Sequence, residues 1–584
     1  MRIARRRYVE LFLRYVRPHR RRALLLGVLL LSNIGLQLLN PQLLRAFIDQ
    51  AIAGVAVEDL AKIALAFMAI ALVNQVLAAS AQYVGEDLGW AATNTLRADL
   101  LLHTLRLDIG FHKTRTPGEL IERIDGDVTA LAVFFSRFVV NVFGNGVLLI
   151  GVLLVVAHED PRAGLALTAF AVIAVFIMAG PLRSVAVGWW KQEREVQAQM
   201  YGFVGERIDG TEDIRSSGAE SHVMNGLALH HRSWLRTRRR AFLAGTVLWS
   251  SSIMTFAIGS AIAFGVGAYL WSLGAITLGT VYLLFHYTDI LRQPIEQFRR
   301  ELEQMQQAVA SISRIDELLA TRSRLSDTGG AALPAGPLPV ELDAVSFGYE
   351  PDQPILRDIS LRLQPGEVLG VLGRTGSGKT TLARLLLRFY DPNQGTVRLG
   401  GIDVREAPLS EVRRRATLVT QDVQLFHARI RDNVTLFDRA IDDTRVTAVL
   451  ERIGLGAWLR ASSSGDGAAL DAEMYASGLS AGEAQLLAFA RVFVRDPGLV
   501  ILDEASSRLD PATERQIEEA IDALLKDRTA VVIAHRLGTV QRCDTILVLE
   551  EGRVVEYGRR AALAADPASR FSQLLATGFE QVVA

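Results

Sequence analysis

The chain has 584 residues, no net formal charge and a single cysteine, and half of its residues are hydrophobic. Because one hydrophobic core does not organise a chain this long, we expect about two to four domains. The balanced charge argues against nucleic acid as a partner, and the lone Cys543 excludes an internal disulfide framework and fits a reducing, cytosolic environment.

The first 22 residues carry nine arginines beside one acid, Glu10. This basic cluster is interpreted either as a solvated tail or as a cytoplasmic membrane anchor. The apolar stretch that follows is too long for a signal peptide and has no small-residue cleavage site after it, so we expect it to be retained.

Six stretches are apolar enough and long enough to cross roughly 30 Å of hydrocarbon. None of them contains Asp, Glu, Lys or Arg, whereas a soluble helix shows a polar face every few residues. The sequence therefore predicts six membrane spans, at residues 23–44, 63–84, 138–157, 163–180, 241–270 and 271–287.

The orientation of these spans follows from the charge of their connections. Lys and Arg concentrate in the N-terminus and in the connections 97–123 and 183–240, and they are scarce near Gly54, Glu159 and Gly274. Both termini are therefore expected in the cytoplasm, in a multi-pass protein of the plasma (inner) membrane. The two long connections have amphipathic helical patterns, so we expect their helices to continue past the bilayer into the cytosol.

Residues 321–339 are rich in Ser, Gly, Ala and Pro and predict a linker between a transmembrane domain, 1–320, and a soluble domain, 340–584. In the soluble domain, strand-like runs alternate with helical ones, which is typical of an α/β fold. The expected fold is thus an α-helical membrane domain fused to an α/β P-loop nucleotide-binding domain, with strands at 340–347, 367–372, 416–419, 499–502, 529–534 and 545–549.

Residues 373–380 read Gly-Arg-Thr-Gly-Ser-Gly-Lys-Thr, between an apolar run and a helical one. In such a loop, glycines let successive N–H groups converge on phosphate oxygens, and the following helix adds the positive end of its dipole. Lys379 is expected to reach the outer phosphates and Thr380 to bind magnesium. The sequence therefore predicts a nucleoside triphosphate site made of Gly373, Arg374, Thr375, Gly376, Ser377, Gly378, Lys379, Thr380 and Thr381.

An apolar strand ends in two carboxylates, Asp503 and Glu504, about 125 residues after this loop. Phosphoryl transfer needs a carboxylate that holds magnesium and a second group that orients or deprotonates water. We expect Asp503 to hold the metal and Glu504 to act on the attacking water.

Together these motifs resemble an ATP-binding cassette exporter half-transporter, from the first span to about Gly558. The resemblance implies ATP and Mg²⁺ as cofactors. It also implies that Tyr349 stacks on adenine, that Gln421 contacts magnesium, and that His535 contacts the γ-phosphate. Ser480 and Gly482, in Leu479-Ser-Ala-Gly-Glu483, would offer a hydroxyl and a backbone N–H to the partner's nucleotide. Residues 506–510 resemble the loop that crosses the dimer interface, and residues 111–120 and 210–218 resemble the connections that dock onto the ATPase domains. The resemblance thus implies the catalytic residues Lys379, Gln421, Glu504 and His535 and the magnesium ligands Thr380, Gln421 and Asp503.

Two residues of the signature depart from the family pattern, Leu-Ser-Gly-Gly-Gln: Ala481 replaces a glycine and Glu483 the glutamine. Arg508 also stands where a small residue is usual. Glu483 would place a negative charge near a polyphosphate unless it points away or pairs with a cation. Heterodimeric relatives often combine an intact catalytic glutamate with an altered signature, as here with Glu504. We therefore favour a second, different half-transporter as the partner, with a homodimer as the alternative.

The resemblance implies ATP-driven export, and a membrane-anchored ATPase that acts as a gate or regulator and an importer of the same fold remain alternatives. Because the spans carry no charge, an amphipathic or lipid-like substrate (a small molecule, lipid or peptide) is favoured over a strongly charged small one. Polar residues within the spans either line a cavity or join helices to one another: Asn33, Gln37, Asn40, Asn74, Gln75, Asn141, Asn145 and His286.

Overall fold

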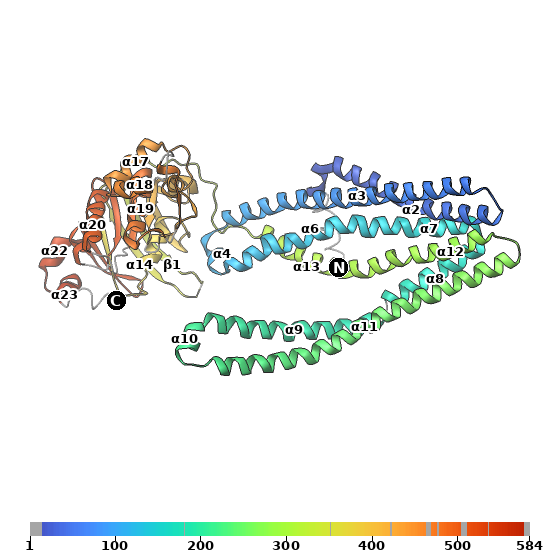
Figure 1. Cartoon of the computed structure of the whole chain (residues 1–584). Coiled ribbons are helices and arrows are strands. Elements are labelled where there is room, and N and C mark those ends of the chain that lie inside the picture. The colour runs from blue at the N-terminus through green and yellow to red at the C-terminus, as the bar shows by residue number, and fades with distance from the viewer. Residues whose placement is uncertain are drawn as a thin grey trace. The chain divides into compact units, whose positions relative to one another are not determined.

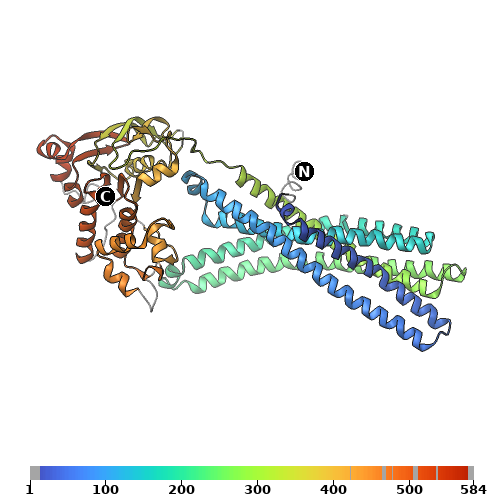
Figure 2. The same ribbon diagram turned by 90° about the horizontal axis from the view of Figure 1, so that it is seen from above.

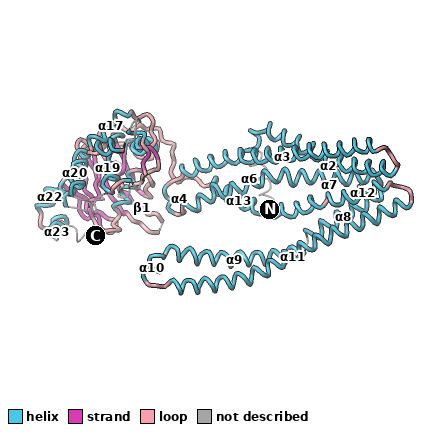
Figure 3. The backbone as a smooth tube through the Cα atoms, in the orientation of Figure 1, coloured by secondary structure: helices cyan, strands magenta, loops and turns pink. Residues whose placement is uncertain are grey.

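The computed structural model describes residues 14–179, 181–350, 352–420, 423–462, 469–475, 478–503, 511–534 and 537–576. The chain divides into two compact units: a helical unit, Met1–Leu105 with Pro117–Thr321, and a cassette unit, Arg106–Thr116 with Arg322–Ala584. Figure 1 traces the chain by colour, and Figure 3 shows that all strands of the described residues belong to the cassette unit. The short segment Arg106–Thr116 thus groups with the cassette, although it lies between helices of the membrane half in the sequence.

The helical unit is dominated by long helices, several of which run side by side (Figure 2). At 1.5 Å per residue, α3 and α11 are about 75 and 80 Å long, more than twice the thickness of the hydrocarbon layer. The prediction that the helices continue beyond their apolar segments is therefore confirmed. The main helices are α2 Arg20–Ile52, α3 Val57–Arg106, α7 Asn145–Glu159, α8 Pro161–Ala179, α9 Pro181–Asp209, α11 Glu220–Ser272, α12 Leu278–Ile290 and α13 Arg292–Ala320. Shorter pieces connect them: η1 Arg17–His19, α5 Pro117–Ile121, η2 Glu122–Gly126, α6 Asp127–Arg137, η3 Phe138–Gly144 and α10 Thr211–Ser216.

Four helices of the described residues are long and apolar enough to cross a membrane: Arg14–Ile52, Val57–Arg106, Asn141–Glu159 and Glu220–Ser272. The predicted span 163–180 corresponds to α8, which contributes the shorter apolar helix Pro161–Ile177. The predicted start of the last span was wrong, because α11 continues to Ser272 and α12 begins only at Leu278. The turn lies at Gly274, whose φ of +67° favours glycine. The Thr277 side chain caps α12 by accepting from the Thr280 N–H, and the Asp49 carboxylate accepts from the Gly279 N–H at 2.9 Å.

Polar groups join α2 to α3 within the apolar segments. The Asn33 side-chain amide donates to Asn74 Oδ1 at 2.7 Å, and Gln37 donates to Asn33 Oδ1 at 2.6 Å. Asn33 is buried. Of the two interpretations of the polar span residues, joining of helices holds for Asn33 and Asn74, and Gln37 supports Asn33 from within α2.

The cassette unit contains two main sheets. An antiparallel sheet has the strand order β2-β1-β4-β5, and a second sheet has the order β12-β11-β3-β10-β9-β6. In the second sheet β11, β3, β10, β9 and β6 are parallel and β12 is antiparallel to β11. The strands are β1 Val340–Phe347, β2 Leu356–Leu363, β3 Val368–Leu372, β4 Gln394–Leu399, β5 Ile402–Asp403, β6 Ala416–Val419, β9 Leu499–Asp503, β10 Thr529–Ile533, β11 Thr545–Glu550 and β12 Arg553–Arg559, and β7 Ala428–Arg429 pairs with β8 Glu473–Met474.

The six predicted strands all occur, with ends that agree to within one residue. Three longer strands, β2, β4 and β12, were not predicted. In β2 and β4 exposed or half-buried positions accompany buried ones, and β12 has only exposed and half-buried positions. Such strands lie at a surface and carry a weaker apolar signal than β3 or β10, whose residues are all buried.

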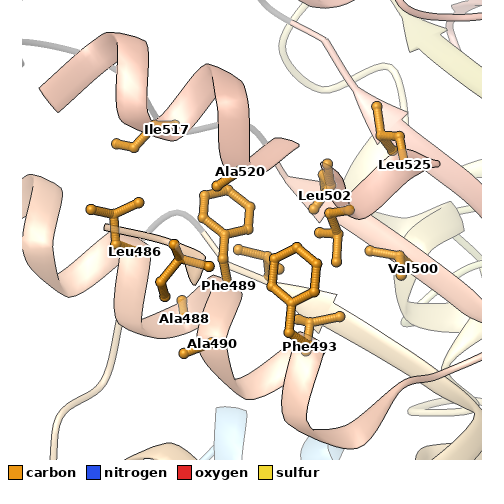
Figure 4. Packing of buried hydrophobic residues seen from close by; sticks show 14 of the residues in the cluster. Leu486, Ala488, Phe489, Ala490, Phe493, Val500, Leu502, Ile517, Ala520 and Leu525 are labelled. Carbon is orange, nitrogen blue, oxygen red and sulfur yellow. The ribbon is translucent and has the colours of Figure 1, made fainter. Parts of the chain in front are cut away.

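The helices of the cassette cover the sheets and position the site. They are α4 Ile109–Lys113, α14 Lys379–Leu386, α15 Leu409–Arg415, α16 Ile430–Thr435, α17 Asp443–Arg452, α18 Gly456–Ala461, α19 Ala481–Arg495, α20 Pro511–Leu525, α21 Leu537–Gln541, α22 Arg560–Ala565 and α23 Arg570–Ala576. Figure 4 shows how α19 is fixed: Phe489 and Phe493 pack among Ala520 of α20 and Val500 and Leu502 of β9. Each such aromatic side chain contributes about 1.5–3 kcal/mol on burial, so the second half of α19 is held firmly against the sheet.

Candidate functional site

The glycine-rich loop runs from the end of β3 to the start of α14. Gly373 and Gly378 have φ values of +149° and +104°, which disfavour any residue with a Cβ. A Cβ added at Gly373 would lie 2.2 Å from the Leu549 carbonyl oxygen, and one at Gly378 would lie 2.6 Å from Leu356 Cδ2. Only glycine therefore allows the chain to curl this tightly, as a cradle of backbone N–H groups requires.

Lys379, the first residue of α14, is buried, and its ammonium donates to the carbonyl oxygens of Gly373 at 2.6 Å and Arg374 at 3.1 Å. Burial lowers the pKa of Lys379, and the Asp503 carboxylate partly offsets this. A buried cation stabilises the fold only when it is compensated, and here the partial compensation comes from carbonyl oxygens and one carboxylate. The arrangement fits an anion that approaches the loop.

Ser377 gives an independent indication that the loop fits phosphate. Its hydroxyl is buried at the inner side of the loop and has no hydrogen-bond partner among the residues that the structure describes. Because a buried hydroxyl without a partner is unfavourable, a phosphate oxygen would satisfy it. The exposed Thr380 hydroxyl and the half-buried Asp503 carboxylate supply oxygen donors beside it. Mg²⁺ takes most of its ligands from phosphate and water, so a site with only a few protein oxygen donors suits it.

The parallel strands bring distant parts of the sequence to one edge. Strands β3, β10, β9 and β6 are neighbours in this order, and each adjacent pair is parallel. The glycine-rich loop follows β3, Ala534 follows β10, Asp503 ends β9 and Thr420 follows β6. Ligands of open α/β sheets bind at this carboxyl edge. Gln421, Glu504 and His535 come next in the sequence after three of these ends, and they lie outside the described residues, as does Arg508.

Tyr349 lies beside the glycine-rich loop, where polar side chains contact its hydroxyl and two aromatic rings pack against its ring. The hydroxyl accepts a hydrogen bond from Arg384 Nη1 at 2.9 Å and lies 3.2 Å from Thr381 Oγ1. The rings of Phe347 and Tyr390 stand nearly perpendicular to the Tyr349 ring, at 5.2 and 5.1 Å between centroids. An aromatic side chain so close to Thr381 can stack on a base whose phosphates lie in the loop.

The signature segment begins α19. Ser480 is the N-cap residue, and its hydroxyl accepts from the Glu483 N–H at 3.2 Å. The Glu483 carboxylate accepts in turn from the Ser480 N–H at 2.8 Å and from the Ser480 hydroxyl at 2.9 Å. This is a capping box, which the spacing Ser-x-x-Glu itself indicates. Among the residues that the structure describes, the Glu483 carboxylate has no cation partner and instead accepts from both donors of Ser480.

Comparison with known proteins agrees with this geometry. Residues 23–295 match the family described as ABC transporter transmembrane region, and residues 356–507 match the family described as ABC transporter. An uncharacterized ABC transporter ATP-binding protein of Bacillus subtilis, YknV, is 31% identical over 566 residues, which cover 95% of this chain and 92% of that protein.

The chain belongs to the ABC transporter family.

Further similarities point to export. A putative multidrug export ATP-binding/permease protein of Staphylococcus aureus is 28% identical over 575 residues, covering 95% of this chain and 97% of that protein. The solved structure of a bacterial Atm1-family ABC exporter with ATP bound has a TM-score of 0.79 and 25% identity, covering 96% of this chain and 98% of that one. This ABC transporter is thus an exporter-type chain in which a membrane region and an ATP-hydrolysing cassette are fused, and it couples ATP hydrolysis to transport.

Two residues near the nucleotide site of this ABC transporter were missed by sequence reasoning. Arg384 is bonded to Tyr349, and Lys113 of α4 places its ammonium 4.9 Å from the centroid of the Tyr349 ring. Arg384 lies three positions after Thr381 on α14, so both side chains are on one face and helical periodicity offered a signal for it. Lys113 is 236 positions before Tyr349, and no local pattern indicates the contact.

Proposed function

We propose that this chain is one half of a dimeric exporter that moves an amphipathic or lipid-like substrate out of the cytoplasm by alternating access. The observation that carries the proposal is the fusion, in one chain, of apolar helices of spanning length with a single phosphate loop. One cassette supplies one loop and one signature, so a second chain is needed to complete each ATP site. The relatives named for multidrug export and the Atm1-family exporter support the outward direction.

At the ATP site, we assign each group by its place in the sheet. The loop residues 373–381 hold the phosphates, Lys379 compensates their charge, and Tyr349 stacks on adenine. Thr380, Asp503 and Gln421 hold Mg²⁺, which neutralises charge on the phosphates when bound. Glu504 positions and activates the attacking water, and His535 contacts the γ-phosphate. Ser480 and Gly482 face the nucleotide held by the partner chain.

An amphipathic substrate is supported by a cavity of about 520 Å³ between α9 and α11. Trp190, Phe242 and Trp249 line it with aromatic surface. On the same wall, Arg238 donates to the buried carboxylate of Glu193 at 2.7 Å. A molecule with an apolar body and a polar group can contact both kinds of surface at once.

The cavity assignment predicts that Trp249→Ala raises the amphiphile concentration needed for half-maximal transport by about two- to tenfold, because one aromatic contact is lost. Trp271→Ala, an exposed tryptophan at the end of the same helix, is the matched control. Equal effects of the two variants on transport would contradict the assignment.

The partner is proposed to be a different half-transporter, because the chain keeps Glu504 but has an altered signature at Ala481 and Glu483. The chain's own loop would then meet an unaltered signature and carry most of the turnover. Purification of the chain alone tests this. A stable dimer with two equal hydrolytic sites would establish a homodimer instead.

The test of the function is ATP-dependent uptake of a fluorescent amphiphile into inverted membrane vesicles. Uptake should require ATP and should be lost in Glu504→Gln, which should still bind ATP but hydrolyse it at least about 100-fold more slowly. Hydrolysis without any uptake would favour the gate or regulator. ATPase activity of Glu504→Gln within a factor of about two of wild type would remove Glu504 from the role assigned to it.

A further inference from the structure

We propose that Lys113 of α4 competes with the adenine ring of ATP for the face of Tyr349, and thereby sets the nucleotide affinity of this cassette. The proposal rests on the function proposed above, in which Tyr349 stacks on adenine. It assigns a specificity-determining role to a residue that belongs, by sequence, to a connection of the membrane half.

The segment that carries Lys113 is attached to the cassette by contacts of its own. One oxygen of the buried Asp108 carboxylate caps α4 by accepting from the Phe111 N–H at 3.1 Å, and the other accepts from the Arg324 N–H at 2.8 Å. Gly110 lies close to the cluster, since a Cβ built on it would be 3.5 Å from Tyr390 Cε1. The Asp108 hydrogen bonds and this close approach place α4 beside the aromatic cluster that contains Tyr349.

Within that cluster, the Lys113 ammonium lies 4.9 Å from the Tyr349 ring centroid, within the range of a cation–π contact. The ring itself cannot easily turn away, because Arg384 and Thr381 hold its hydroxyl and two other rings pack at its sides. The proposal places the base on the ring face that the ammonium now covers, so stacking there would displace the ammonium.

The contact is weak enough for a nucleotide to displace. Burial and the charge of Arg384 lower the pKa of Lys113, whereas Tyr349 raises it, so the ammonium gains from the ring but loses hydration and lies near a like charge. Stacking of an aromatic base on a tyrosine gains a comparable or larger amount. Binding of the adenine ring thus releases Lys113. The released residue lies on α4, which begins only a few residues after α3, the 50-residue helix that carries an apolar segment of spanning length.

The test separates the base from the phosphates. Full-length protein in lipid nanodiscs is titrated with ATP and with inorganic tripolyphosphate, each in competition with a fluorescent nucleotide, and the ratio of the two affinities is measured. Lys113→Met removes the cation while keeping a long side chain. It should raise the affinity for ATP relative to tripolyphosphate by about two- to fivefold, the size expected of an exposed cation–π contact.

Three variants make the result decisive. Lys526→Met, which makes the same change at an exposed position of the cassette, should leave the ratio at the wild-type value. Lys113→Arg retains a cation and should also keep it. In a Tyr349→Leu background, Lys113→Met should no longer change the ratio.

An unchanged ratio in Lys113→Met, or equal changes in the affinities for ATP and tripolyphosphate, would overturn the competition and leave Lys113 as a phosphate-attracting or structural charge. The proposed function fails by a different result. If the wild-type protein does not bind ATP, or if Lys379→Ala binds it as tightly as wild type, the nucleotide site itself is wrongly assigned.

Discussion

Replacement of Glu483 by glutamine is expected to increase ATP turnover at the site that this signature faces. In the structure the Glu483 carboxylate takes both donors of Ser480, at 2.8 and 2.9 Å. A phosphate that bound the Ser480 hydroxyl would have to displace one of these bonds and approach a negative charge. Glutamine keeps the capping box, because its amide oxygen can accept from the same donors, but it removes the charge.

The magnitude follows from the geometry. A phosphate oxygen bonded to the Ser480 hydroxyl would lie within about 5 Å of the carboxylate, since each is about 2.7–2.9 Å from the same atom. Two unit charges at about 5 Å repel by about 1 kcal/mol in water and about 3 kcal/mol near a protein surface. Glu483 is half-exposed, so the lower value applies, and it corresponds to about a fivefold change in phosphate affinity. The loss of a charge at the start of α19 should lower stability by only about 0.3–1 kcal/mol.

The assay is ATP hydrolysis by the purified full-length protein, with the thermal unfolding midpoint as a check on folding. If the chain is active alone, both sites carry the altered signature and turnover should rise about fivefold. If a second subunit is required, total turnover should change by less than about twofold, because the partner's own carboxylate limits that site. In that complex the effect is isolated by adding Glu504→Gln, after which the residual turnover should rise about fivefold in Glu483→Gln. Glu519→Gln, the same charge change on the neighbouring α20, is the control. An unchanged or lower turnover at the isolated site, or an equal rise in Glu519→Gln, would refute the repulsion.

Two further changes test the loop and the helical unit. Lys379→Ala should weaken ATP binding at least about tenfold, because the phosphates lose a buried cation, as measured by nucleotide titration of the purified protein; unchanged affinity would mean that the loop does not hold the phosphates. Asp127→Asn should destabilise the helical unit by about 2 kcal/mol, because the buried carboxylate accepts from Ser311 and from Arg314 Nε, each at 2.8 Å. The cost is kept this low because Arg314 is half-exposed, so that solvent screens its charge. Thermal unfolding in detergent measures this, and Asp125→Asn, whose exposed carboxylate pairs with Arg97, should cost less than about 1 kcal/mol.

Features that depend on neighbouring residues could be predicted from the amino-acid sequence alone. The glycine-rich loop, the helix after it and six of the strands were all predicted to within a few residues, because apolar runs and glycines act through local backbone preferences and burial. The apolar segments and their continuation as long helices follow from the same local preferences. The local signal is weak in the surface strands β2, β4 and β12, which were not predicted. It is also weak at the start of α12, which a hydrogen bond from Gly279 to the distant Asp49 helps to set.

Which groups share a site depends on how distant segments of the chain pack together. The order of the parallel strands brings the end of β9, with Asp503, to the same edge as the loop after β3, although more than a hundred residues separate them. The direction of the Glu483 carboxylate depends on the geometry of the first turn of α19, and the sequence left it open. Neither local sequence indicates the contact of Lys113 with Tyr349, because a cation–π contact requires only that the two side chains lie close together. They are brought together by the packing of α4 on the cassette, near Asp108 and Gly110.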